Sequence, residues 1–208
     1  ANVAAIMSAY NRLNGEACSS SDLLLNTILR DEWGFDGHVV SDCGAVEDIH
    51  DHHKITKTME ESAARAVLNG CDMCCGCSYA KIPEAVKQGL LSEADVDRAV
   101  SRLMETRFRL GMFDPPERVV YAQIPIELND CAEHRDLAIQ MARKAMTLLK
   151  NENGLLPLRK DLRAIAVIGP NGDSLAALLG NYHGTPSSYT TAVNGIRAAV
   201  SPETTVYY

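Results

Sequence analysis

The sequence lacks several features that would assign it to a functional class at once. Acidic residues outnumber basic ones and the net charge is −7, so the basic stripe that binds nucleic acid is missing. No apolar run approaches the ~20 residues that a membrane-spanning helix requires. The first residues, Ala1 to Met7, carry no charged region of the kind that opens a signal peptide. These absences predict a chain that binds neither nucleic acid nor membrane.

Familiar catalytic and binding signatures are missing too. Gly169-Pro-Asn-Gly172 follows an apolar segment, but it lacks the glycine and lysine patterns of nucleotide-binding loops. His50, His52 and His53 stand near acidic residues, but no His-Glu-x-x-His is present to hold zinc. No Gly-x-Ser-x-Gly surrounds Ser41. A tight turn and a solvated histidine loop explain these segments better, so we predict neither a metal nor a cofactor.

The chain has seven cysteines, four of which lie at positions 71, 74, 75 and 77. Cys71 and Cys74 have the C-x-x-C spacing of a redox pair or of half a zinc site, but no second such pair exists. Buried or loop thiols are the favoured interpretation. A disulfide involving Cys18 or Cys43 and a metal site are the alternatives. The odd count leaves at least one thiol unpaired within the chain. The cysteines therefore do not decide between an oxidising and a reducing cellular compartment.

Strand-like and helix-like segments alternate in the first half of the chain. The predicted strands are Val3–Tyr10, Gly37–Ser41 and Cys71–Cys75. The predicted helices are Ser19–Trp33, Thr58–Asn69, Pro83–Gly89 and Ser92–Leu110. This alternation predicts βαβ units and a parallel sheet, hence an α/β fold. Because three strands cannot close a barrel, this half is an open sheet or a fragment of a barrel.

The second half begins with a proline-rich connector from about Phe113 to Asn129. It continues with a predicted helix, a strand, a helix and a final strand, over Ala132–Asn151, Ala164–Ile168, Ala192–Val200 and Thr204–Tyr208. This pattern is typical of the start of a second α/β domain. Both ends of the chain look like strands entered or left in mid-domain, which suggests a segment of a longer protein.

Asp42 is the strongest candidate for a functional residue. It ends an apolar run bounded by Gly37, and a carboxylate at the carboxyl end of a parallel barrel strand is typically catalytic. The alternative is that Asp42 caps the following helix. Tyr10 and Asn11 follow the first predicted strand, so they should lie at the same sheet edge as Asp42. Such a group suits a hydroxyl-rich ligand, although a plain strand-to-helix loop would look alike.

Taken together, these segments resemble glycoside hydrolase family 3. The resemblance is carried by seven stretches, 7–11, 14–15, 29–37, 39–44, 66–72, 138–158 and 165–171. It implies a (β/α)8-type barrel, a linker and an α/β sandwich. Residues 1–112 would then be the C-terminal portion of the barrel domain, 113–160 a linker with a helix, and 161–208 the N-terminal portion of the sandwich domain.

The resemblance also implies an activity, because the family consists of retaining, exo-acting β-glycosidases. Asp42 matches the nucleophile, which forms a covalent glycosyl-enzyme. Tyr10 and Met7 match residues at the sugar pocket. Many β-glucosidases of the family have Trp after the nucleophile, where this chain has Cys43, which we expect to be a further substrate-binding residue. The acid/base Glu is expected beyond Tyr208, and the sugar-binding Lys-His pair, an Arg and an Asp before the first residue.

Cys43, together with Cys18 and Cys75-Gly76, is similar to the xylosidase-type branch of the family, as is the segment 179–186. We therefore expect hydrolysis of terminal β-D-xylosyl residues from oligosaccharides or aryl β-glycosides. A β-glucosidase, a non-catalytic carbohydrate-binding fragment and a nucleotide-binding domain are the alternatives. The mechanism requires no cofactor. The resemblance favours a periplasmic or extracellular protein, leaves the oligomeric state open, and implies that the isolated segment is inactive.

Overall fold

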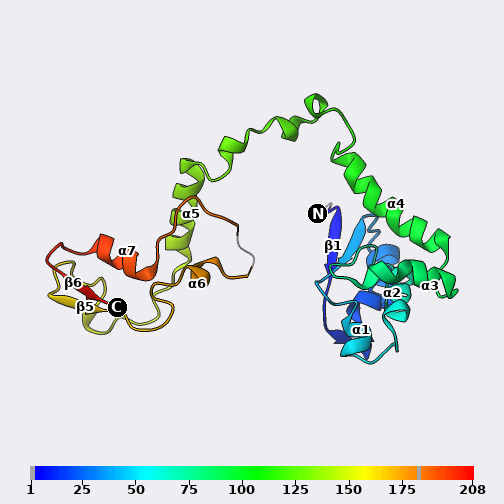
Figure 1. Cartoon of the computed structure of the whole chain (residues 1–208), viewed down its shortest axis with the longest axis horizontal. Coiled ribbons are helices and arrows are strands. Elements are labelled where there is room, and N and C mark those ends of the chain that lie inside the picture. Colours follow the sequence, from blue (N-terminus) through cyan, green and yellow to red (C-terminus); the bar gives the residue numbers. More distant parts are fainter. Residues whose placement is uncertain (1–2, 182–183) are drawn as a thin grey trace. The chain divides into compact units, whose positions relative to one another are not determined.

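The computed structural model describes residues 3–181 and 184–208. It divides into two compact units, Ala1–Gln123 and Ile124–Tyr208, which are described separately. Figure 1 colours the first unit from blue to green and the second from green to red. Tyr182 and His183, which belong to the segment 179–186 named above, lie outside the described residues. No helix among the described residues is long and apolar enough to cross a membrane.

The first unit is built on two parallel strands, β1 (Ala5–Ser8) and β4 (His38–Ser41). Their register pairs Ser8 with Ser41, which confirms the predicted parallel pairing. The predicted strand at Cys71–Cys75 is wrong, because the described residues form only one bridge there, between Val40 and Met73. The reason is that a side chain replaces a backbone acceptor: the amide of Val39 donates to the carboxylate of Asp72 at 2.9 Å instead of to a backbone carbonyl.

Helices of the first unit follow the predicted order with shorter bounds. The longer ones are the π-helix η2 (Leu23–Glu32) and the α-helices α2 (Met59–Leu68), α3 (Ile82–Lys87) and α4 (Glu93–Arg109). The shorter elements are β2 (Arg12–Leu13), β3 (Glu16–Ala17), η1 (Cys18–Ser20), α1 (Asp48–Asp51), η3 (Ser78–Lys81), η4 (Pro116–Arg118) and η5 (Val120–Gln123).

Side-chain caps account for two of the helix starts. The hydroxyl of Thr58 accepts from the amide of Glu61 at 3.2 Å, at the start of α2. At the start of α4, Ser92 and Asp95 form a reciprocal capping box, which satisfies two backbone donors that the helix leaves unpaired.

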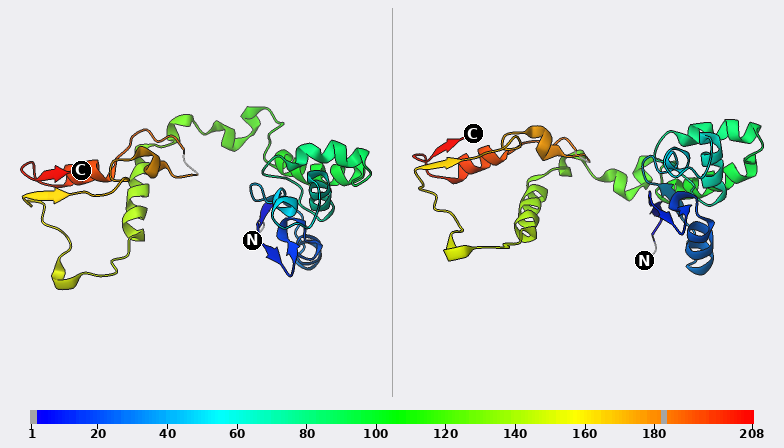
Figure 2. Two further views of the ribbon diagram at one scale, coloured as in Figure 1. Left: turned by 60° about the horizontal axis from the view of Figure 1, so that its bottom comes forward. Right: turned by 90° about the horizontal axis from the view of Figure 1, so that it is seen from below.

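Two apolar clusters make up the core of the first unit. One gathers Leu25 and Leu29 of η2 with Val39 of β4 and with Val46 and Ile49 after it. The other joins α2, α3 and α4 through Ala64, Val67, Ala85, Leu91 and Ala99. Figure 2 shows these three helices packed together in both views. Residues of β4 and of the segment after it are both buried in the first cluster. The residue that directly follows β4 therefore has a defined position.

The second unit contains a second parallel pair, β5 (Ala164–Ala166) and β6 (Thr205–Tyr207), with Ile165 opposite Val206. Its helices are η6 (Ile126–Leu128), α5 (Ala132–Ala145), η7 (Glu152–Gly154), α6 (Leu175–Leu179) and α7 (Ala192–Ala199). The predicted helix to Asn151 ends earlier, at Ala145. The segment from Gly169 to Gly172 is a tight turn, in which the amide of Gly172 donates to the carbonyl of Gly169.

Candidate active site

Asp42 lies at the carboxyl edge of the β1–β4 pair, directly after Ser41. Its amide donates to the carbonyl of Ser8 at 3.1 Å, so the segments that follow β1 and β4 begin side by side. The Asp42 side chain is partly exposed, and its Oδ1 accepts from the amide of Cys43 at 2.7 Å. The helix that follows is α1, whose N-cap residue is Glu47. Asp42 therefore does not cap that helix.

Tyr10 reaches the same edge from the loop after β1. Its hydroxyl donates to the carbonyl of Cys43, and its own carbonyl accepts from Nε2 of His53 at 2.8 Å. Because a carbonyl can only accept, Nε2 of His53 must carry the proton. The predicted position of Tyr10 at the edge that carries Asp42 is thus observed. Its hydroxyl is bonded to Cys43 and its carbonyl to His53, which follows α1.

Met7 is the third predicted site residue, and it lies in β1 opposite Val40. The residue is 61% exposed. Side chains of neighbouring strands at paired positions point to the same face of a sheet. Met7 therefore lies on the open face of the pair, whereas Ser8, the next residue, is buried.

Cys43 forms a disulfide with Cys75. The disulfide alternative is therefore confirmed for Cys43, whereas Cys18 is a free, buried thiol. The cysteines at 71, 74, 77 and 131 are also free. Within residues 3–181 and 184–208, no group of three or more histidine, cysteine or acidic residues could hold a metal ion. Of the histidine cluster, His52 pairs with Asp48 at 2.7 Å.

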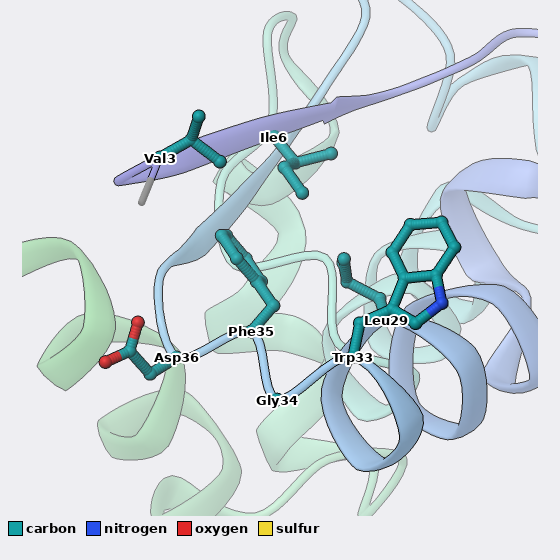
Figure 3. Close-up of a pocket in the computed structure, with 7 residues that line it drawn as sticks. All are labelled: Val3, Ile6, Leu29, Trp33, Gly34, Phe35 and Asp36. Atoms are coloured by element: carbon teal, nitrogen blue, oxygen red, sulfur yellow. The ribbon is translucent and has the colours of Figure 1, made fainter. Parts of the chain in front are cut away.

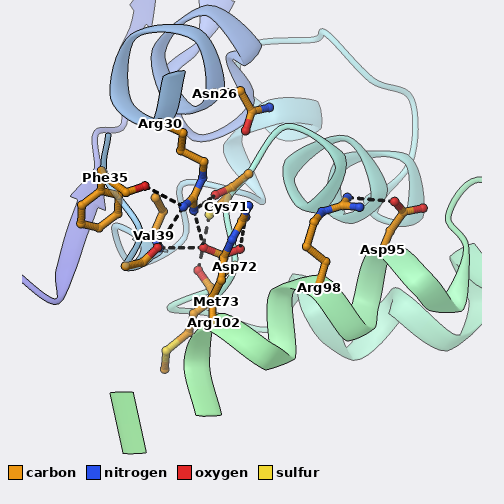
Figure 4. Close-up of polar contacts among 12 residues, drawn as sticks. Asn26, Arg30, Phe35, Val39, Cys71, Asp72, Met73, Asp95, Arg98 and Arg102 are labelled. Carbon is orange, nitrogen blue, oxygen red and sulfur yellow. Dashed lines mark hydrogen bonds and ion pairs between the residues drawn. The ribbon is translucent and has the colours of Figure 1, made fainter. Parts of the chain in front are cut away.

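A buried carboxylate lies behind the site. Asp72 accepts from Arg30 at 2.8 Å and from Arg102 at 3.0 Å, and Figure 4 shows both guanidinium groups converging on it. Arg30 also donates to the carbonyl of Gly37 at 3.0 Å, just before β4. Burial lowers the pKa of Arg30, and the Asp72 carboxylate opposes this by stabilising the charge. This cluster fixes the strand on which Asp42 is carried.

The hollow drawn in Figure 3 is not at this edge. It has a volume of about 580 Å³ and is lined by Val3, Ile6, Leu29, Trp33, Gly34, Phe35 and Asp36. Val3 precedes β1 and Asp36 precedes β4, so the hollow lies towards the amino ends of the two strands. None of the four predicted site residues lines it, and its walls are mostly apolar. We therefore place the candidate site at the Asp42 edge.

Sequence reasoning did not single out Glu47, which bridges two loops of the site. Its Oε1 accepts from the amide of Cys77 at 2.8 Å. No sequence signal marked this residue, because its partner is a backbone group thirty positions away. Cys75 is predicted from the sequence as one of four clustered cysteines, but its pairing with Cys43 is not. Both belong to the structure that surrounds Asp42.

Comparison with known proteins gives consistent matches along the chain. Residues 1–106 match the glycosyl hydrolase family 3 N-terminal domain, and residues 146–206 match the C-terminal domain of that family. A xylan 1,4-β-xylosidase from Xylanibacter ruminicola is 45% identical over 200 residues, which are 95% of this chain and 23% of that protein.

Solved structures agree with these matches. A GH3 exo-β-xylosidase in complex with a xylobiose aziridine activity-based probe superposes with a TM-score of 0.82 at 32% identity, over 100% of this chain and 27% of that one. A β-glucosidase from Erythrobacter marinus gives a TM-score of 0.76 at 34% identity, over 97% of this chain and 27% of that one. The chain thus spans about a quarter of the length of the proteins it matches.

Proposed function

Because this chain belongs to glycosyl hydrolase family 3, we propose that it is part of a retaining β-glycosidase in which Asp42 is the nucleophile. The observation that supports this role best is the position of Asp42. It follows β4 at the carboxyl edge of a parallel pair and caps no helix. Carboxyl ends of parallel barrel strands are where such enzymes carry their catalytic groups.

The proposed reaction has two displacements. In the first, Oδ2 of Asp42 attacks the anomeric carbon while an acid protonates the departing glycosidic oxygen. In the second, the same acid residue, now a base, takes a proton from water; the water oxygen bonds to the anomeric carbon, the bond to Asp42 breaks, and the sugar is released. The hydrogen bond from Cys43 to Oδ1 would hold the carboxylate in one orientation. The acid/base residue belongs to the part of the enzyme beyond Tyr208, and the mechanism needs no cofactor.

The proposed architecture follows from the same membership. Residues 1–112 form the C-terminal portion of a (β/α)8-type barrel domain, 113–160 a linker, and 161–208 the first portion of an α/β sandwich. The two parallel strand pairs and their flanking helices are compatible with this arrangement. Tyr10, Met7 and Cys43 would then surround the sugar at the barrel edge.

Terminal β-D-xylosyl residues of oligosaccharides are the proposed substrate. The relative from Xylanibacter ruminicola and the solved exo-β-xylosidase support this choice. β-Glucosides are the second candidate, because β-glucosidase structures also superpose on the chain. In this chain the residue after Asp42 is Cys43, which is disulfide-bonded. A cysteine at this position resembles the xylosidase-type branch, so it supports a xyloside as the substrate.

The experiment uses the full-length protein that carries this sequence. It is incubated with a xylose-configured aziridine probe, digested and analysed by mass spectrometry, and its turnover of 4-nitrophenyl β-D-xyloside and β-D-glucoside is measured. We expect the label on Asp42, faster turnover of the xyloside, and loss of turnover by several orders of magnitude in Asp42→Ala. Exposed Asp97→Ala serves as the control. Normal turnover by Asp42→Ala, or a label on another carboxylate, would refute the nucleophile role.

A further inference from the structure

The loop that carries Asp42 is bonded along its length to the segment Met73–Cys77. Ser41 donates its amide to the carbonyl of Met73 at 2.8 Å, and its hydroxyl accepts from the amide of Cys75 at 3.0 Å. The amide of Gly44 donates to the carbonyl of Cys75 at 2.7 Å. The two segments therefore have to move together, and whatever holds the second one also holds the nucleophile loop.

Two side-chain ties close this junction. One is the Cys43–Cys75 disulfide. The other is Glu47, whose Oε1 accepts from the amide of Cys77 at 2.8 Å. The ties start from either side of Gly44 and end on either side of Gly76. The two ties therefore hold the turn Cys75–Cys77 against the loop that carries Asp42.

Gly76 explains how the Glu47 carboxylate fits. Its φ of 147° lies in a region that side chains disfavour. A Cβ at this position would lie 2.8 Å and 2.9 Å from the two carboxylate oxygens of Glu47. The absence of a side chain thus makes the space that the carboxylate fills. The Glu47 carboxylate therefore lies directly against the backbone of Gly76.

We propose that Glu47 is a positioning residue for the nucleophile of this enzyme. It holds the turn at Cys75–Cys77 through a charge-assisted hydrogen bond, and through that turn it fixes the Asp42 loop. It shares this task with the Cys43–Cys75 disulfide. The proposal rests on the proposed function of Asp42, since it concerns the geometry of attack. Glu47 itself touches no reacting atom.

The first test compares Glu47→Ala with Glu47→Gln in the full-length protein. An amide oxygen can still accept from the Cys77 amide, whereas alanine cannot. We expect Glu47→Ala to lower kcat on 4-nitrophenyl β-D-xyloside about tenfold with little change in KM, because misplaced reacting groups mainly slow the chemical step. Glu47→Gln should stay within about threefold of wild type. Glu84→Ala, at a partly exposed glutamate on α3, is the matched control. Equal activity losses in the Gln and Ala variants would overturn the proposal, as would no loss from Glu47→Ala either alone or combined with removal of the disulfide.

The second test asks whether the two ties share one task. Cys75→Ser removes the disulfide, and the double variant removes both ties. If both ties hold the same turn, the loss in kcat of the double variant should exceed the product of the single losses, because each tie compensates for the other. A double variant whose loss equals that product would overturn the shared role.

A readout without substrate separates this proposal from the proposed function. Amide hydrogen exchange of the peptide that contains Cys77 should be faster in Glu47→Ala than in wild type or Glu47→Gln. Faster exchange with wild-type turnover would refute the positioning role and leave the nucleophile assignment intact. If wild type proves inactive on glycosides while exchange behaves as expected, the proposed function fails and the structural tie remains.

Discussion

The carboxylate of Asp72 and the guanidinium of Arg30 form an ion pair at 2.8 Å in which the Asp72 side chain is 1% exposed and the Arg30 side chain 10% exposed. The same carboxylate accepts from the amide of Val39, so it also serves as a hydrogen-bond partner of β4. Through these contacts, one buried charge connects η2, β4 and the segment after α2. It is the main polar support beneath the strand that carries Asp42.

Replacing Asp72 with alanine should therefore be strongly destabilising. It would leave Arg30 buried without its counter-ion and the Val39 amide without its acceptor. Removing one partner of a buried ion pair typically lowers the free energy of unfolding by about 3–5 kcal/mol. Chemical denaturation of the full-length protein would measure the loss. Asp97→Ala, an exposed aspartate on α4, should change stability by less than about 0.5 kcal/mol. A similar small change for Asp72→Ala would contradict the structural role.

Local patterns in the sequence were enough to predict much of the fold. The spacing of Thr58 and Glu61 marked the start of α2, and the apolar runs marked both strands of each parallel pair. The position of Asp42 after such a run predicted that it lies at the carboxyl edge of β4, and the structure has it directly after Ser41. These signals work because they depend on residues within one turn or one strand.

Features that depend on distant partners could not be predicted in the same way. Arg30 and Asp72 are 42 positions apart, and Cys43 and Cys75 are 32 apart. The strand expected at Cys71–Cys75 is replaced by a single bridge because a side chain takes the place of its backbone acceptor. Such a substitution leaves no trace in hydrophobic periodicity.

The stability of the protein should fall in alkali because of Cys71. Burial raises the pKa of this thiol from its usual 9.0 to about 11, so the folded state retains a proton that the unfolded state has lost. The free energy of unfolding should then decrease as the pH rises from about 9 to 11, by about 2–3 kcal/mol from this group. Below that window the contribution is fully present.

Cys71→Ala tests this expectation, because it removes the titrating group from a small buried site. Urea denaturation at several pH values between 8 and 11 should give a flatter curve for the variant than for wild type. Some slope should persist, since burial also raises the pKa of Tyr79, whose hydroxyl donates to the carbonyl of Cys71 at 2.5 Å. Parallel curves for wild type and variant would contradict the assignment to Cys71.

Cysteine labelling should follow exposure and pairing. Cys77 is free and exposed, whereas Cys18 and Cys71 are free and buried. We expect iodoacetamide to modify Cys77 first under native conditions, because reaction requires an accessible thiolate. The two buried thiols, Cys18 and Cys71, should react only after unfolding. Cys43 and Cys75 should react only after reduction. Peptide mapping by mass spectrometry measures the order, and labelling of Cys43 without a reductant would contradict the disulfide.

Removing the capping box of α4 should cost a moderate amount of stability. The hydroxyl of Ser92 accepts from the amide of Asp95, and the Asp95 carboxylate accepts from the amide of Ser92. The Ser92 hydroxyl and Arg98 lower the pKa of Asp95 by hydrogen bonding to its charged form. Ser92→Ala should lower the free energy of unfolding by about 1 kcal/mol at neutral pH. The difference in the free energy of unfolding between wild type and Ser92→Ala should shrink in acid as Asp95 is protonated. A constant difference down to pH 2 would show that the Asp95 carboxylate does not contribute to the cap.

Tyr10→Phe tests the hydrogen bond that joins the two loops of the candidate site. The variant keeps the aromatic ring but loses the donor to the carbonyl of Cys43. A neutral hydrogen bond contributes about 0.5–1.5 kcal/mol, so kcat/KM on an aryl β-xyloside should fall by about two- to twelvefold. Tyr121→Phe, at an exposed tyrosine of η5, should leave the rate unchanged. If Tyr10→Phe matches wild type in kcat/KM while Asp42→Ala is inactive, the nucleophile acts without this tie, and the loop after β1 serves only to shape the edge.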